Sequence, residues 1–355
     1  MAVAVAAAIF SASMTAIIVV ICFPYGWLFH AHGFGVPILL RPRDLTLQYI
    51  MSWPLIAWLY RQVAAGKLEK APWLANASRH WHGCSMSSPS PLSQPEPWNL
   101  VSPGYVDILL PEFTKYARHA LEKVGLDENA HVLDVATGPG TCALLAAALV
   151  KQVTAIDFAH DMLNAARKRA AGQGLRNVEF HEGDAQTLPF ADNTFDAAFS
   201  IFGLIFFPDR IAGLKEMRRV LKPSGKVGLT SWVPFKEVPL IEAVFTVIGQ
   251  HLSTPFGSDG PPPLGTPELI REEFGAAGFA DIDVTRIENT VHESTLHAYW
   301  ESMVRSTAPL TLLRKRMGDA WGQFEKGVFA ELLNRFGAGP VTITMPAWLT
   351  VASKT

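Results

Sequence analysis

The sequence predicts an α/β fold in which a mostly parallel sheet is covered by helices on both faces. From about residue 104 onward, short apolar runs alternate with stretches of helical periodicity. This alternation is typical of strands joined by crossover helices, which makes neighbouring strands parallel. A glycine turn follows the first apolar run, in VLDVATGPGT at residues 132–141. Such a turn commonly joins a strand to a helix beside a ligand.

The elements of this domain can be placed in order along residues 104–355. The first helix is expected behind Pro111, because proline suits a first helical turn and apolar residues recur there at helical spacing. Further helices are expected at 161–171 and at 209–221, the latter ending before LKPSG. A largely helical insert is expected at 294–336, either as extra core packing or as a lid over a substrate mouth. Strands are expected at residues 131–136, 153–156, 178–180, 195–201, 226–232, 280–287 and 341–351.

The N-terminal 61 residues predict a membrane anchor followed by an interfacial segment. Residues 1–23 are almost entirely apolar and are long enough for a helix that crosses a hydrocarbon layer of roughly 30 Å. The first cations, Arg41 and Arg43, follow this run, so we expect the catalytic domain on the cytosolic side. The apolar stretch at 45–60 is interrupted by Pro54 and is expected to lie in the interface. The alternatives are a targeting peptide and helices packed on the globular domain.

Residues 62–103 are expected to form a linker, since their later part is rich in serine and proline. The formal net charge is only −2, so the composition gives no argument for a nucleic-acid partner. Three scattered cysteines provide neither a disulfide framework nor a zinc site. The string HWHGC at 80–84 has potential ligands but no second cluster to complete a site, and we expect no metal.

The glycine turn is open to two interpretations. Gly138 and Gly140 satisfy the dinucleotide pattern G-x-G-x-x-[GA], and Asp157 at the end of the second strand could hold a ribose in either case. Asp134, however, lies just ahead of the turn, where a carboxylate would repel a pyrophosphate. S-adenosylmethionine carries an ammonium and a sulfonium and no phosphate, so the carboxylate favours it. Asp184, after the third strand, could accept a hydrogen bond from an adenine amino group.

Four motifs in this order resemble the class I S-adenosylmethionine-dependent methyltransferases, in the branch with ubiquinone and menaquinone methyltransferases. The resemblance covers about residues 98–232 well, and it implies a Rossmann-like, seven-stranded sheet with an antiparallel last strand. It also implies S-adenosylmethionine as the cofactor. The motifs are DVATGPGT, AIDFAHDML, EGDAQTLPFADNTFDAAFS and MRRVLKPSGKVGLTSW.

The resemblance also implies roles for individual residues. Those expected to bind the cofactor are Asp134, Ala136, Gly138 and Gly140 at the methionine moiety, Asp157 at the ribose, Phe158 and Met162 beside the adenine, Asp184 with Ala185 at its edge, and also Ser200. Ser200 and Phe202, after the fourth strand, are expected to face the reacting centre, and the candidates for a base are Tyr105, His160 and His181. Two departures from the family are Ala136, where glycine is common, and the missing histidine after the fourth strand, which weakens a quinone assignment.

The sequence therefore predicts a methyltransferase that acts on a small, apolar or aromatic acceptor at a membrane surface. In-line methyl transfer mainly requires the nucleophile, methyl group and sulfur to be aligned and water to be excluded. A nicotinamide-dependent oxidoreductase and a catalytically inactive, membrane-tethered scaffold remain as alternatives. The acceptor, the atom methylated and the oligomeric state stay open.

Overall fold

The structure is a computed structural model that describes residues 3–11, 14–23, 26–31, 38–40, 90–252 and 262–355. The chain divides into two compact units, Met1–Ser88 and Pro89–Thr355. The interfacial segment predicted at 45–60 and the string at 80–84 lie outside the described residues.

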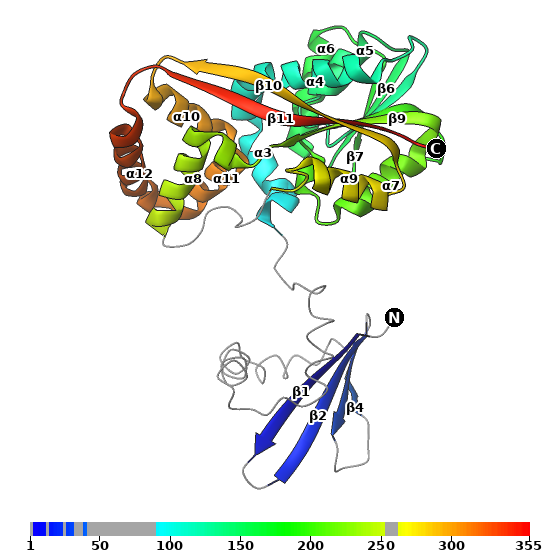
Figure 1. Ribbon diagram of the computed structural model, residues 1–355, viewed down its shortest axis with the longest axis vertical. Coiled ribbons are helices and arrows are strands. Elements are labelled where there is room, and N and C mark those ends of the chain that lie inside the picture. Colours follow the sequence, from blue (N-terminus) through cyan, green and yellow to red (C-terminus); the bar gives the residue numbers. More distant parts are fainter. Residues whose placement is uncertain (1–2, 12–13, 24–25, 32–37, 41–89, 253–261) are drawn as a thin grey trace. The chain divides into compact units, whose positions relative to one another are not determined.

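The N-terminal unit contains four strands in an antiparallel sheet that follows the order of the sequence (Figure 1). They are β1 (Val3–Ser11), β2 (Met14–Phe23), β3 (Gly26–Ala31) and β4 (Ile38–Leu40). The helix expected at 1–23 is therefore replaced by a pair of strands. Valine and isoleucine favour extended backbone, and an apolar run without periodicity does not distinguish a helix from strands. Within the described part of the chain, every helix is too short or too polar to span a membrane.

The second unit begins earlier than the predicted boundary at residue 104. A short 3-10 turn, η2 (Pro91–Ser93), and helix α3 (Pro95–Gly104) occupy the end of the expected linker. Pro95 occupies the first turn of α3, where its missing N–H leaves no hydrogen bond unmade. The Trp98 indole donates to the Leu92 carbonyl at 2.8 Å, which ties the helix to the turn before it. Proline in this segment therefore starts a helix rather than preventing one.

A seven-stranded sheet forms the centre of this unit, in the order β10-β11-β9-β8-β5-β6-β7 (Figure 1). β11 pairs antiparallel with both β10 and β9, and the other strand pairs of this sheet are parallel, which confirms the predicted mostly parallel sheet with an antiparallel last strand. The strand β9 begins five residues before the predicted start at 226. The strands are β5 (His131–Val135), β6 (Gln152–Asp157), β7 (Val178–Glu182), β8 (Phe195–Ile201), β9 (Leu221–Trp232), β10 (Ala280–Glu293) and β11 (Val341–Ser353).

Helices cover both faces of the sheet (Figure 1). On one face, α4 (Leu110–Val124) and α5 (Thr141–Ala147) pack their apolar residues on β5, β6 and β8. On the other face, α7 (Arg210–Val220) and α9 (Pro267–Ala276) pack on a second cluster of buried residues. Helix α6 (His160–Gly172) follows β6 and packs on β6 and β7. The helices predicted at 161–171 and 209–221 correspond to α6 and α7.

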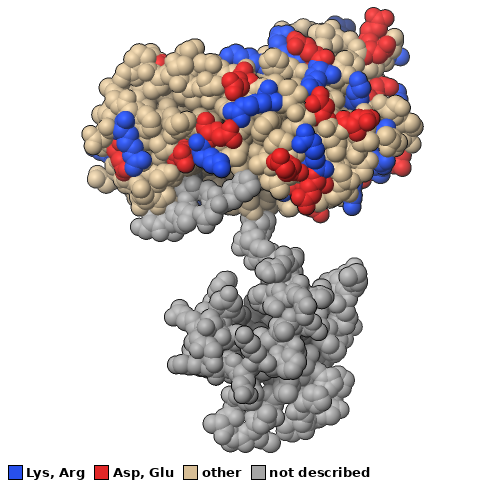
Figure 2. Space-filling view, in the orientation of Figure 1, with Lys and Arg blue, Asp and Glu red and all other residues tan. Residues whose placement is uncertain are grey.

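A group of helices at one end of the sheet forms what we call the cap region (Figure 1). It consists of α8 (Pro239–Leu252), α10 (Leu296–Ser306), α11 (Ala308–Met317) and α12 (Trp321–Phe336). The last three occupy the predicted helical insert, and α8 was not predicted. The cap region has a hydrophobic core of its own, to which Trp300, Phe324 and Val328 belong. Figure 2 shows that cations and anions are interspersed on the visible face of the second unit.

Candidate active site

The carboxyl ends of β5, β6 and β7 are joined by backbone hydrogen bonds. The Thr137 amide, after β5, donates to the Ile156 carbonyl at 3.1 Å. The Gly183 amide, after β7, donates to the Asp157 carbonyl at 3.0 Å. Because β8 pairs on the other side of β5, the strand order reverses here, which is where open α/β sheets bind ligands. The predicted residues that follow these three strands therefore lie on one edge of the sheet.

The turn after β5 depends on left-handed backbone conformations. Ala136, Gly138 and Gly140 have φ angles of 53°, 54° and 79°. A side chain at Gly140 would place its Cβ 3.1 Å from the Cβ of Ala166, so this glycine allows the start of α5 to approach α6 closely. Arg169 on α6 donates to the Pro139 carbonyl and fixes the middle of the turn. The turn is thus rigid and carries few side-chain atoms toward the strand ends.

Asp134 is a buried carboxylate that holds both sides of this turn. Its Oδ2 accepts from the Thr137 hydroxyl at 2.6 Å and from the Ala143 amide, in the first turn of α5, at 2.9 Å. Burial raises the pKa of Asp134 to about 7, although both hydrogen bonds oppose the shift. Asp134 therefore occupies the positive N-terminus of α5, as a bound anion otherwise would.

Asp157, at the end of β6, contacts the same turn from the neighbouring strand. Its Oδ2 accepts from the Gly138 amide at 2.8 Å, and its Oδ1 accepts from the Ala159 amide at 2.8 Å. Burial raises the pKa of Asp157 to about 6 against these two hydrogen bonds. A carboxylate has about four lone-pair sites, so Asp157 retains acceptor capacity for ligand hydroxyls.

Phe158 and Met162 pack beside the strand ends together with Tyr105. Met162 on α6 is buried, and Phe158 and Tyr105 are half-buried on the same apolar cluster. Tyr105 begins a π-helical turn, η3 (Tyr105–Leu109), of the kind often found at functional sites. Burial, and then the nearby charge of Asp157, raise the pKa of Tyr105 above its ordinary value. Tyr105 therefore stays a neutral phenol that can donate a hydrogen bond, and the structure does not support it as a base.

The histidines considered as bases lie within hydrogen-bond distance of neighbouring glutamates. The Nδ1 atom of His160 lies 2.8 Å from Glu182, and the Nε2 atom of His181 lies 3.0 Å from Glu179. The side chain of His160 is 60% exposed. These contacts fit surface pairs better than a catalytic base.

Asp184 and Ala185 follow β7 and begin the next loop. Asp184 is exposed, and its Oδ1 accepts from the Gln186 amide at 2.8 Å. Ala185 is buried, so its backbone is fixed against the body of the domain. The second carboxylate oxygen of Asp184 accepts a long hydrogen bond from the Gln186 side chain, at 3.3 Å.

Ser200 does not fit the catalytic role expected from its sequence position. It is completely buried at the end of β8, and its Oγ accepts from the Leu204 amide at 3.1 Å. The hydroxyl therefore stabilises the turn after β8. Sequence position correctly placed Ser200 at a strand end, but did not reveal that its side chain is used locally.

Phe202, after the same strand, belongs to an aromatic cluster that the sequence analysis did not assemble. We define the aromatic cluster as Phe113, Tyr116, Phe202 and Trp232. Phe202 stacks on Trp232 with 3.9 Å between ring centroids, and Tyr116 meets Phe202 edge-on at 5.0 Å. Phe113 contacts both Phe202 and Tyr105, at 5.1 Å and 5.4 Å. The cluster thus continues from Tyr105, beside the strand edge, to the end of β9.

Ala136, which stands where glycine is common in the family, lies against a second small residue, Gly203. A Cβ added to Gly203 would lie 2.4 Å from the Cβ of Ala136, so a side chain at 203 is incompatible with alanine at 136. Phe202, with a φ of 57°, turns the chain away just before this contact. The sequence places both residues after strand ends, but only the fold shows that they share one space.

Comparisons with known proteins agree with this geometry. Residues 132–225 match a family described as a methyltransferase domain. An uncharacterized protein of Mycobacterium tuberculosis is 41% identical over 108 residues, which are 30% of this chain and 39% of that protein. A demethylmenaquinone methyltransferase of Staphylococcus epidermidis is 36% identical over 146 residues, which are 40% of this chain and 59% of that protein. Less than two thirds of either relative is therefore matched.

Among solved structures, a putative methyltransferase of Bacillus halodurans covers 67% of this chain and 98% of its own, with 23% identity and a TM-score of 0.47. The family match over residues 132–225 includes the glycine turn and the strand-end carboxylates Asp134, Asp157 and Asp184. Over residues 132–225 the chain therefore carries a methyltransferase domain, and in this region it is similar to S-adenosylmethionine-dependent methyltransferases.

Proposed function

We propose that this protein binds S-adenosylmethionine and transfers its methyl group to a small, apolar or aromatic acceptor. One observation favours S-adenosylmethionine over a nicotinamide dinucleotide. The Gly138 and Ala143 amides, which a pyrophosphate would need at the turn, already donate to Asp157 and Asp134. The turn therefore presents carboxylates rather than free N–H groups, and this favours a cationic, phosphate-free nucleoside over a nicotinamide dinucleotide.

The edge residues fit the parts of this cofactor. Asp134 and the turn at 136–140 would face the methionine end, where the ammonium and sulfonium are attracted by carboxylate charge. Asp157, with its remaining acceptor sites, would hold the ribose hydroxyls. Phe158 and Met162 would flank the adenine, and Asp184 with Ala185 would contact its edge. Tyr105 would donate a hydrogen bond at the same site.

The aromatic cluster supports an apolar or aromatic acceptor. Its rings begin beside Tyr105 and end at Trp232, so an acceptor next to them would lie close to the strand edge. Aromatic rings bind planar ligands through stacked and edge-on contacts. The similarity to demethylmenaquinone methyltransferases favours a quinone-like ring among such acceptors, although the histidine expected after the fourth strand for a quinone is missing from this chain.

The bound cofactor would supply the electrophilic methyl group and the leaving sulfur. The residues of this chain would align the acceptor with that methyl group and exclude water, which are the main requirements of an in-line displacement. Phe113, Phe202 and Trp232 are suited to both tasks because they form a continuous apolar wall.

We also propose that residues 1–61 hold the enzyme at a membrane, on the cytosolic side. The support is the absence of acidic and basic residues from the first 40 positions, and a lipid-dissolved acceptor would be reached most easily there. Removal of residues 1–88 should release the second unit from membranes and leave cofactor binding intact. Retention of the truncated chain on membranes would contradict this anchoring.

Methyl transfer is tested by incubating the full chain with methyl-labelled S-adenosylmethionine and a membrane lipid extract. We expect label to appear in an apolar, aromatic product, and to disappear from it when Asp157 is replaced by alanine. A chain that binds the cofactor but labels no acceptor would instead be a scaffold with the fold and without the activity.

A further inference from the structure

The loop after β7 lies along the whole length of helix α7, and its first contact is made by Gln186. The Gln186 Oε1 accepts from the Asp209 amide, at the N-cap of α7, at 2.9 Å. The Gln186 Nε2 donates to both carboxylate oxygens of Asp184, at 3.2 Å and 3.3 Å. Gln186 therefore links the exposed carboxylate of Asp184 to the start of α7.

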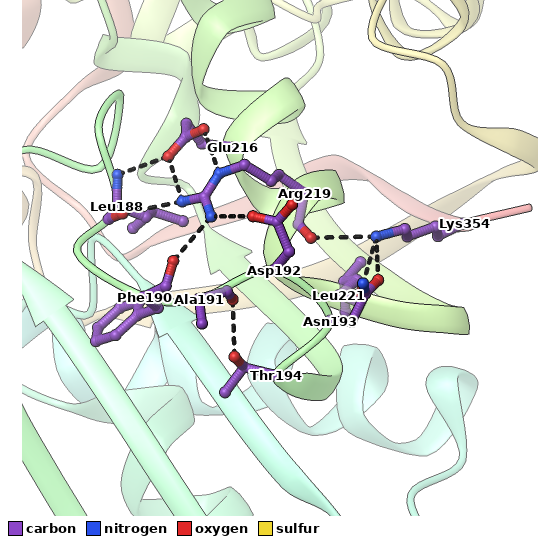
Figure 3. A network of polar contacts seen from close by, with 10 residues as sticks. All are labelled: Leu188, Phe190, Ala191, Asp192, Asn193, Thr194, Glu216, Arg219, Leu221 and Lys354. Atoms are coloured by element: carbon purple, nitrogen blue, oxygen red, sulfur yellow. Dashed lines mark hydrogen bonds and ion pairs between the residues drawn. The ribbon is translucent and has the colours of Figure 1, made fainter.

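Arg219, near the end of α7, holds the middle of the same loop (Figure 3). Its guanidinium donates to the Leu188 carbonyl at 2.9 Å, to the Phe190 carbonyl at 2.8 Å and to Asp192 at 2.7 Å. Its partner Glu216 accepts from the Leu188 amide at 2.8 Å. The loop is thus fixed by hydrogen bonds to the main-chain atoms of Leu188 and Phe190. The ion pair between Arg219 and Asp192 at the surface adds a further contact.

The Arg219–Glu216 pair stays charged because each partner favours the charged form of the other. Two hydrogen bonds join Arg219 to Glu216, at 2.7 Å and 2.8 Å, and the bond from Arg219 lowers the pKa of Glu216. Bidentate arginine–carboxylate pairs fix direction as well as distance. Lysine could not replace this arginine fully, because its single ammonium lacks the planar fork.

The far end of the loop is fastened to the end of α7 and to the C-terminal strand. The Asn193 and Thr194 amides donate to the Arg219 and Val220 carbonyls at 3.1 Å and 2.8 Å. Lys354, after β11, donates to Asn193 and to the Leu221 carbonyl, at 2.8 Å and 2.6 Å (Figure 3). Helix α7 therefore sets the path of residues 184–194 from end to end.

We propose that Gln186 and Arg219 are positioning residues that hold Asp184 where it selects a 6-aminopurine over a 6-oxopurine cofactor. This inference rests on the proposed function, since it concerns the adenine end of the same site. A carboxylate accepts a hydrogen bond from an exocyclic amino group and repels the carbonyl oxygen that replaces it in hypoxanthine. An exposed aspartate free to rotate would make this contact only part of the time, so holding it increases the discrimination.

The test compares two ligands, S-adenosylhomocysteine and S-inosylhomocysteine, by calorimetric titration of the full chain. We expect the wild type to prefer the adenine form by about tenfold or more, the range for one hydrogen bond to a charged group. Arg219→Gln and Gln186→Ala should each lower this ratio several-fold, mainly by weakening the adenine form. A positioning role changes this ratio, whereas a general loss of stability would weaken both ligands alike.

Arg218→Gln is the matched control, because Arg218 is the adjacent arginine on α7 but donates to Gly278 and to Thr355 instead of to the loop. It should keep the wild-type ratio, and Arg219→Lys should restore it only in part. Gln186→Ala removes no charge, so it decides the question if Arg219→Gln fails to fold. The inference is overturned if both variants keep the wild-type ratio, or if the wild type binds the two ligands equally. A wild type that binds neither ligand would instead refute the proposed function.

Discussion

The strand edge and the cap region are stabilised in different ways. At the edge, two buried carboxylates accept from the amides of Gly138, Ala143 and Ala159, so specific backbone atoms are fixed in specific places. In the cap region the core consists mainly of apolar side chains, with a polar contact at Glu325, which accepts from the indoles of Trp300 and Trp321 at 3.0 Å each. The backbone at the edge is therefore held in one conformation by specific hydrogen bonds. An apolar core such as that of the cap region can be packed by many different sequences.

Helix α3 connects these two regions. Ser102 donates to the Asp161 carbonyl on α6 at 3.3 Å, while Lys315 on α11 pairs with Glu96 at 2.6 Å. Gly104 lies against α10 so closely that a Cβ there would be 2.0 Å from the Arg305 carbonyl oxygen. Substitutions at the edge should therefore alter cofactor affinity, and substitutions in the cap region should alter stability. A larger residue at Gly104 should push α3 away from α10.

The largest effect is expected for Asp157→Ala. It leaves the Gly138 and Ala159 amides without their acceptor and removes the proposed ribose contact, so S-adenosylhomocysteine affinity should fall about 100-fold. Calorimetric titration measures this. Asp161→Ala is the control, because within the described residues Asp161 bonds through its main chain, and it should bind within about twofold of the wild type. Equal losses in the two variants would contradict the assignment of the edge.

Gly104→Ala is expected to lower the free energy of unfolding by about 1–3 kcal/mol, because α3 and α10 must move apart. Gly172→Ala, in α6, is the matched control, since a Cβ there meets no atom within 4 Å. Urea denaturation of the two variants measures the difference. If Gly104→Ala is as stable as Gly172→Ala, the close contact between α3 and α10 does not exist in solution.

Glu325→Gln tests the cap region alone. The glutamine amide oxygen can accept from one indole, but its NH2 group cannot accept from the other, so stability should fall by about 1–2 kcal/mol while the cofactor affinity stays unchanged. Glu331→Gln, on the same helix, breaks only a partly exposed pair with Arg335 and should change stability by less than about 0.5 kcal/mol. A fall in cofactor affinity with Glu325→Gln would show that the two regions are not separable.

The pH dependence should differ between ligand binding and stability. The pKa values of Asp134 and Asp157 are raised to about 7 and about 6, so acid protonates them and removes the charge that attracts the cofactor. If both carboxylates must be ionised, S-adenosylmethionine affinity should fall by about 20-fold from about pH 8 to about pH 6.

The same two groups act on folding in the opposite direction. The native state binds their protons more tightly than the unfolded state, so their contribution to stability without cofactor falls as pH rises from about 4 to about 7. Titrations and thermal melts across this range check both trends. An affinity that rises on acidification would contradict the role of the two carboxylates.

The sequence predicted the positions of the edge residues because these features have local causes. Glycines that adopt positive φ and carboxylates that end strands are visible in the residue order, as at Gly138, Gly140 and Asp157. The aromatic cluster could not be predicted, since Phe113, Phe202 and Trp232 come from three different elements. The local use of the Ser200 hydroxyl likewise depends on a turn that sequence does not specify.

Two errors at the N-terminus have a common cause. Residues 1–23 and 62–103 were interpreted from composition, as a membrane helix and as a linker. Composition shows whether a segment is apolar or rich in proline. It does not show which hydrogen bonds the backbone of that segment forms, and these decide between helix, strand and loop. The structure has strands β1 and β2 in the first segment and α3 at the end of the second.

The central claim is that the carboxylates at the edge, by occupying the amides of the glycine turn, select a cationic nucleoside without phosphate. Calorimetric titration of the wild-type chain with S-adenosylmethionine and, separately, with oxidised and reduced nicotinamide dinucleotides tests it most directly. We predict saturable heat with S-adenosylmethionine and none with either dinucleotide. Saturable binding of a dinucleotide, or no heat with S-adenosylmethionine, would contradict the claim.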